Sequence, residues 1–139
     1  MKETCILYPV FVQAALTFGM LMWMAKERFA ARARGEVKPV EPGVRATFTG
    51  RAGQVSNSYN NQLEIPTLFY AVAAFALITH SVDGVMIGLA WAYAVLRLVH
   101  AWIHTTYNKI PDRFKAFLAS NVVLITMWVW LALKVSGLV

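Results

Sequence analysis

Four long apolar segments constrain this chain more than any other feature. They occupy residues 6–25, 63–80, 85–107 and 114–136. Each comes close to the roughly 20 helical residues that cross the hydrocarbon core of a bilayer. A hydrophobic content of 58% and a mean hydropathy of +0.52 exclude an ordinary soluble domain of 139 residues. The sequence therefore predicts an all-α integral membrane protein.

One long connection and two short ones join these segments, which favours a four-transmembrane-helix antiparallel bundle in a single domain, 1–139. The second helix is expected to begin before its apolar part, because the polar residues of GRAGQVSNSYNNQLEIPTLF recur in helical phase. Pro66 predicts a kink there. The expected spans are about 6–25, 54–80, 85–107 and 113–136, with a basic loop at 26–53.

The basic residues predict the orientation. Seven of the thirteen Lys and Arg residues lie in the loop 26–53, and three more, Lys109, Arg113 and Lys115, lie between the last two apolar segments or at the very start of the last one. By the positive-inside rule, the loops 26–53 and 108–113 face the cytoplasm and both termini face the opposite side. This distribution accounts for the net charge of +6 without a nucleic-acid partner. We expect a multi-pass protein of a bacterial inner (cell) membrane.

The third helix carries an unusual polar stripe. Arg97, His100, His104 and Asn108 follow i, i+3, i+7 and i+11 spacing, with Tyr107 at the edge. Charged side chains inside a span are costly unless they find a partner or water, so such a stripe marks either a functional site or a clamp between helices.

The second helix offers a matching stripe of Asn57, Asn60, Asn61 and Glu64. Glu64 is the only acid in a predicted span, so it is the expected partner of Arg97. That pair alone is equally well explained as a structural clamp. Together, the two stripes predict a cationic, hydrogen-bonding cleft for an anionic polar molecule.

Metal binding is weakly indicated. His100 and His104 lie one helical turn apart, as in helical zinc sites, but a third ligand is needed and only Glu64 is placed to supply it. No metal site is predicted. The single cysteine, Cys5, excludes an internal disulfide and has no His or acid beside it in the sequence to activate it as a nucleophile.

Two motifs resemble a known family. Asn61-x-x-Glu64 is followed by Pro66, and Arg97-x-x-His100 is followed by an arginine at 113. With four short helices and a basic first loop, the chain resembles the MAPEG family, the membrane-associated proteins in eicosanoid and glutathione metabolism, as a bacterial-type member. The resemblance implies a homotrimer that binds glutathione between subunits, near the cytoplasmic side.

The resemblance also implies residue roles. Asn61 and Glu64 would help to hold the tripeptide, Arg97 would lie against Glu64, and His100 would line the site. Arg113 would be the catalytic residue that holds the thiol as a thiolate, since a nearby guanidinium lowers a thiol pKa. The remaining expected binding positions are Asn57, His104 and Tyr107.

The chain departs from the family pattern at three positions. Asn57 stands where the better-studied enzymes carry an arginine, His104 stands where they carry a tyrosine, and Phe114 follows Arg113 where prostaglandin E synthase has a serine. One cation and one or two hydroxyl donors are therefore missing relative to those enzymes.

The predicted function is a glutathione-dependent transferase or peroxidase, with glutathione as co-substrate, that activates the thiol for attack on a lipophilic small molecule from the bilayer. The alternative is a non-catalytic homologue that binds a lipid or amphiphile, or scaffolds a membrane partner. Arg113 favours the enzyme, whereas the departures at Asn57 and His104 favour the alternative.

Overall fold

The computed structural model describes residues 2–139, which form six helical elements. A short 3-10 helix, η1, runs directly into the first long helix, and α2 is followed almost at once by α3. The chain therefore has four helical spans long and apolar enough to cross a membrane, as predicted. The elements are η1 (Glu3–Ile6), α1 (Leu7–Ala33), α2 (Gly50–Leu63), α3 (Pro66–Ile78), α4 (Gly84–Thr105) and α5 (Ile110–Val135).

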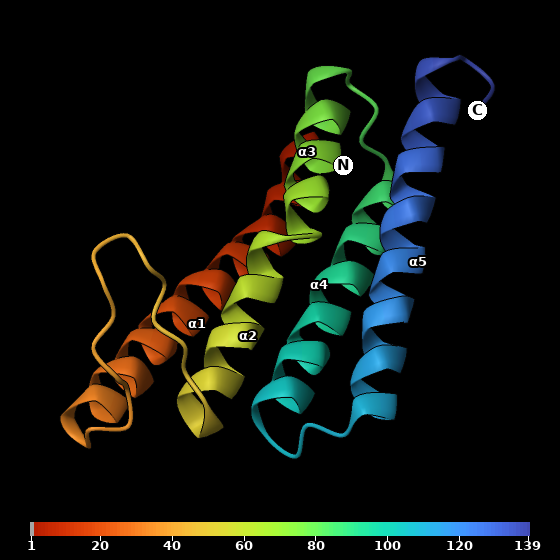
Figure 1. Cartoon of the computed structure of the whole chain (residues 1–139). Helices are drawn as coiled ribbons and strands as arrows, with labels where there is room; N and C mark the ends of the chain where they lie inside the picture. Colours follow the sequence, from red (N-terminus) through yellow and green to blue (C-terminus); the bar gives the residue numbers. More distant parts are fainter. Residues whose placement is uncertain (1) are drawn as a thin grey trace.

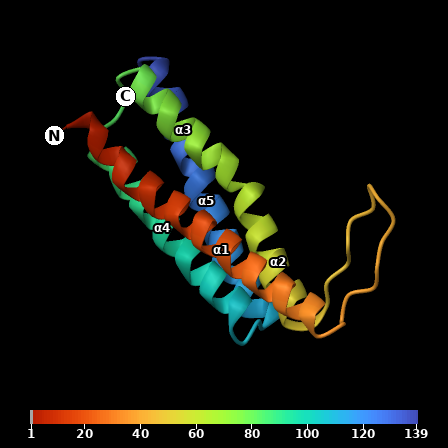
Figure 2. The same ribbon diagram turned by 90° about the vertical axis from the view of Figure 1, so that its left-hand side faces the viewer.

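The spans alternate in direction, so the bundle has two distinct ends (Figure 1). Both chain termini and the 79–83 turn lie at one end, the termini end. The long connection 34–49 and the 106–109 turn lie at the other, the loop end. Figure 2 shows α1 in front of the bundle with α4 and α2 on either side of it, and α1 contacts both. The last helix, α5, packs mainly on α4 and also on α3.

Helix α1 extends beyond its apolar part. Its 27 residues span roughly 40 Å, whereas the hydrocarbon core is about 30 Å thick. The AKERFAARA stretch supplies good helix formers, so the helix continues through Ala33 and carries its basic residues past the apolar run. The GEVKPVEPGV stretch then ends it, as its prolines and glycines predict. The non-helical loop is therefore 34–49.

The second span breaks where Pro66 predicts. Helix α2 ends at Leu63, Glu64 has a non-helical ψ of −105°, and Pro66 begins α3. Proline fits the first helical position because its missing N–H has no helical partner there. The Thr67 hydroxyl donates to the Glu64 carbonyl at 2.7 Å, which satisfies one of the acceptors that the break frees.

Two apolar clusters hold the helices together. The larger lies toward the termini end, where Phe69 stacks on Tyr93 with ring centroids 4.4 Å apart. The smaller joins α1 to α2 near the loop end through Met20, Met24 and Val55. Large apolar side chains on the outer surface remain exposed, as a protein surrounded by lipid requires.

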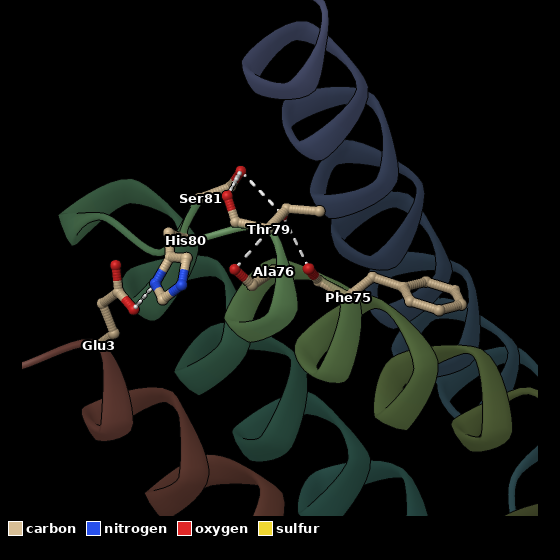
Figure 3. A network of polar contacts seen from close by, with 6 residues as sticks. All are labelled: Glu3, Phe75, Ala76, Thr79, His80 and Ser81. Carbon is tan, nitrogen blue, oxygen red and sulfur yellow. Dashed lines mark hydrogen bonds and ion pairs between the residues drawn. The ribbon is translucent and has the colours of Figure 1, made fainter.

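Polar contacts tie the elements together at the termini end. The Glu3 carboxylate lies 3.0 Å from Nδ1 of His80. This contact, drawn in Figure 3, joins η1 to the end of the second span. His80 adopts a left-handed φ of 52°, and the neighbouring Thr79 hydroxyl donates to the Phe75 carbonyl at 2.8 Å. The turn is therefore fixed by its own side chains.

Asp83 closes the same turn by capping α4. Its carboxylate accepts from the Met86 amide at 2.8 Å and from the Trp130 indole, and it pairs with Lys134 at 2.9 Å. Partial burial pushes the pKa of Asp83 upward, but these donors outweigh it and hold the pKa below its usual value. One side chain thus joins the start of α4 to the end of α5.

We expect Asp83→Ala to lower the free energy of unfolding by about 1 kcal/mol, the usual cost of a lost N-cap, measured by denaturant titration in mixed micelles. Because the folded pKa is depressed, the carboxylate's contribution is complete above the unfolded value of about 3.9 and is lost as pH falls through the folded pKa. The difference in free energy of unfolding between wild type and Asp83→Asn should therefore shrink to zero as the pH is lowered. A difference that stays the same at low pH would contradict this role for the carboxylate charge.

Candidate functional site

Arg97 lies at the centre of the polar contacts between the helices. It is fully buried on α4, and its Nη2 donates to the Asn61 carbonyl at 2.8 Å, to Asn61 Oδ1 at 3.0 Å and to Gln62 Oε1 at 3.2 Å. Gln13 of α1 donates to the same Gln62 oxygen at 3.0 Å. One guanidinium therefore links α1, α2 and α4 through amides.

The predicted ion pair between Arg97 and Glu64 is not formed. Glu64 lies at the break between α2 and α3, where the change in chain direction leaves its side chain exposed. Ion pairs within residues 2–139 join Arg34 to Glu36, His80 to Glu3 and Lys134 to Asp83. Arg97 thus keeps its positive charge without a carboxylate beside it.

A cavity of about 230 Å³, here called the α4–α5 cavity, lies beside this network. It brings together Asn61 of α2, His100 and His104 of α4 and Arg113 of α5. Four of the eight predicted site residues therefore share one cavity, although they come from three helices. Its remaining walls are apolar and belong to α5: Ile110, Phe114 and Phe117.

Arg113 enters the cavity because α5 begins earlier than predicted. The helix starts at Ile110 rather than near 113, with Pro111 and Asp112 in its first turn, a typical helix-start signal. Nη1 of Arg113 donates to Asn108 Oδ1 at 2.8 Å, and Asn108 has a left-handed φ of 48°. Asn108 thus lies in a turn beyond α4 and orients the guanidinium.

The histidines lie side by side along the wall. Their ring centroids are 5.7 Å apart, both side chains are buried, and neither Nδ1 has a hydrogen-bond partner within residues 2–139. No group of three His, Cys, Asp or Glu side chains in those residues is arranged to hold a metal ion. Two imidazoles therefore form part of the cavity wall, and their Nδ1 atoms are buried without a partner in the described residues.

Tyr107 and Asn57 lie outside this cavity. Helix α4 ends at Thr105, so Tyr107 is no longer in helical phase and its ring packs edge-on against Trp102. The pKa of the Tyr107 phenol is raised, mainly because the group is desolvated and also because the Asp112 carboxylate repels the phenolate. Asn57 lines a second cavity between α1 and α2, because the polar stripe of α2 is wide enough to face two neighbours.

Sequence reasoning missed the amides that hold Arg97. Gln13 and Gln62 are both fully buried. Gln13 carried a signal, since it is the only amide side chain in the apolar run 6–25. Gln62 lies beside the predicted stripe rather than on it. Two further contacts, from Gln54 to the His104 carbonyl at 2.8 Å and from Arg51 to the Thr105 carbonyl, satisfy the end of α4.

Four antiparallel helices that are long and apolar enough to cross a membrane define a multi-pass helical membrane protein, and a cavity with Asn61, two histidines and Arg113 in its walls lies between the second, third and fourth spans. The sequence profile of the MAPEG family matches residues 6–133, so the chain belongs to the MAPEG family. A search of curated proteins found no match.

The amide network predicts which polar residue the fold depends on. Gln62→Leu should lower the free energy of unfolding by about 2–3 kcal/mol, because it removes an acceptor from the buried Arg97 and strands the Gln13 amide. Glu64→Gln should change it by less than about 0.5 kcal/mol, because Glu64 is exposed and unpaired within residues 2–139. Both are measured by unfolding in mixed micelles, and the reverse order would contradict the assignment.

Proposed function

We propose that this MAPEG protein is a glutathione-dependent transferase or peroxidase whose reaction takes place in the α4–α5 cavity. The observation that carries the proposal is the position of Arg113, a cation without a carboxylate partner in residues 2–139, in a cavity with Asn61 and two histidines. Glutathione carries two carboxylates, one ammonium and one thiol. Its carboxylates and its thiolate match the cation and the N–H donors of the cavity, and its ammonium would need an acceptor such as the Asn61 amide oxygen.

The proposed chemistry follows from the charge of Arg113. Only the thiolate of glutathione is a strong nucleophile, and an adjacent guanidinium stabilises it relative to the thiol. Arg113 is half-buried and held by Asn108, so it supplies a positioned charge and not a base. Arg97 is buried and donates to Asn61, which lines the cavity, so its charge adds to the positive potential inside the cavity.

The apolar wall suggests how a second substrate arrives. Ile110 and Phe114 line the cavity and are also 69% and 57% exposed on the outer surface. A lipophilic electrophile dissolved in the bilayer would meet these side chains first. The thiol would enter from the loop end, which the basic residues assign to the cytoplasm.

The size of the cavity supports a multi-subunit site. Its volume of about 230 Å³ is below the 300–1,000 Å³ usual for small-molecule pockets. We propose that a neighbouring copy in a homotrimer supplies the missing wall, as the MAPEG resemblance implies.

A titration of the detergent-purified protein with glutathione tests the proposal. A ligand that binds only the folded state raises the melting temperature once its concentration exceeds the dissociation constant. We expect a saturable rise and an ultraviolet thiolate signal from bound glutathione at neutral pH. Arg113→Ala should abolish the thiolate signal while leaving unliganded stability nearly unchanged.

Lys115→Ala is the matched control, because Lys115 lies two residues further along α5, is exposed and does not line the cavity. This variant should retain both the rise in melting temperature and the ultraviolet thiolate signal. Binding without thiolate formation in the wild type would favour the non-catalytic alternative, which the largely apolar α5 wall of the cavity also suits. No shift at millimolar glutathione would contradict a glutathione site.

A further inference from the structure

The α1–α2 cavity, at the loop end, is larger than the proposed reaction cavity and separate from it. Its volume is about 580 Å³, and its walls come from the end of α1, from the loop residues 45–48 and from one face of α2. No residue lines both cavities. The activity proposed above makes no use of it.

Three arginines give this cavity a strong positive charge. Arg28 and Arg32 project from α1, Arg45 comes from the loop, and no Asp or Glu side chain lines the walls. None of the three forms an ion pair within residues 2–139. The acids nearest to Arg28 and Arg32 along the sequence have other partners, since Glu27 accepts from Trp23 and Glu36 pairs with Arg34. Glu41, the acid nearest to Arg45, forms no ion pair within residues 2–139.

Two of the three guanidinium groups, those of Arg28 and Arg32, are held in place. Arg28 donates from Nε to the Ser56 hydroxyl at 2.9 Å and lies 4.7 Å from the centre of the Phe48 ring. Arg32 lies over the same ring at 5.7 Å. Cation–π contacts at these distances orient the planar groups while leaving N–H donors free for an anion.

A glycine allows the loop to close over the cavity. A Cβ added at Gly53 would lie 2.6 Å from the Phe48 carbonyl oxygen, closer than real Cβ contacts come. Only glycine therefore lets this part of the loop lie so near α2. The ring that both arginines share is positioned by that approach.

The cavity changes character along its length. Its basic end lies beyond the apolar run of α1, at the level of lipid headgroups. Leu63, Tyr59 and Met24 line the other end, and Leu63 lies roughly 15 Å further along the axis of α2 than Gly53. Leu63 is 49% exposed on the lipid-facing surface. Polar side chains of α2, among them Asn57 and Asn60, lie between the two ends.

We propose that the α1–α2 cavity binds an anionic phospholipid, with its phosphate among Arg28, Arg32 and Arg45 and the start of an acyl chain toward Leu63. Arginine is well suited to phosphate because its fork of N–H donors matches the phosphate oxygens. Free phosphate carries the same kind of charge but has no apolar group that could contact Leu63, Tyr59 and Met24. Asn57 then serves this lipid site rather than the thiol.

The test uses the full chain in detergent and short-chain lipids as probes. Dioctanoyl phosphatidylglycerol should raise the melting temperature saturably, whereas dioctanoyl phosphatidylcholine, without net charge, should not. Arg45→Gln should weaken binding about fivefold, the effect of about 1 kcal/mol per basic residue at a membrane surface. Arg45 is exposed and makes no side-chain hydrogen bond within residues 2–139, so its loss leaves the fold intact.

Two further variants separate the cavity from general surface charge. Arg34→Gln removes an equal charge from an arginine outside the cavity and should leave lipid affinity unchanged. Gly53→Ala should weaken binding without changing any charge, because it displaces Phe48. Equal losses in Arg34→Gln and Arg45→Gln would overturn the proposal.

Two competing ligands complete the test. Inorganic phosphate that gives the same shift at the same concentration would overturn the lipid assignment in favour of a simple anion site. Displacement of the lipid by glutathione would also overturn it. Arg113→Ala should retain the lipid shift, so failure of the thiol site and failure of this site give different results.

Discussion

The buried guanidinium of Arg97 is the constraint on which the meeting of the first three spans depends. Arginine does not lose its proton in a protein, so a buried one needs acceptors. Here Nη2 donates to amide and carbonyl oxygens of Asn61 and Gln62, and Gln13 brings α1 to the same point. Nε and Nη1 are buried without a partner in residues 2–139. Because no carboxylate neutralises it within residues 2–139, the charge remains and favours anions nearby.

The polar face of α2 contributes side chains to two separate cavities. Asn61 faces the α4–α5 cavity, while Asn57 and Asn60 face the α1–α2 cavity. Both cavities have arginines and no acids in their walls, and both lie toward the loop end. The two proposed ligands are anions of different kinds, a soluble thiol peptide and a membrane lipid. The surroundings of the arginines distinguish the two cavities. Histidines lie near Arg113 in the α4–α5 cavity, and the Phe48 ring of the loop lies against the arginines of the α1–α2 cavity.

The sequence predicted the spans and the break well, because apolar length and proline act locally. It also predicted that His100, His104, Arg113 and Asn61 share one site, because helical spacing and the order of the spans are enough to place them together. The sequence-based predictions were wrong where they depended on the residue at which a helix ends. Tyr107 lost helical phase because α4 stops at Thr105, and the break at Glu64 removed the expected partner of Arg97. The amide network also depends on which faces of α1 and α2 meet, which periodicity alone does not fix.

The packing of α5 has a consequence for how the protein is made. Contacts of Gln13, Gln62 and Arg97 involve only the first three spans, so they can form before the fourth enters the membrane. Arg113 and the apolar wall belong to α5, which packs on α4 and α3. A growing chain therefore acquires its interior charge first and its proposed catalytic cation last. The interior polar network can therefore assemble before α5 completes the larger apolar cluster and the cavity.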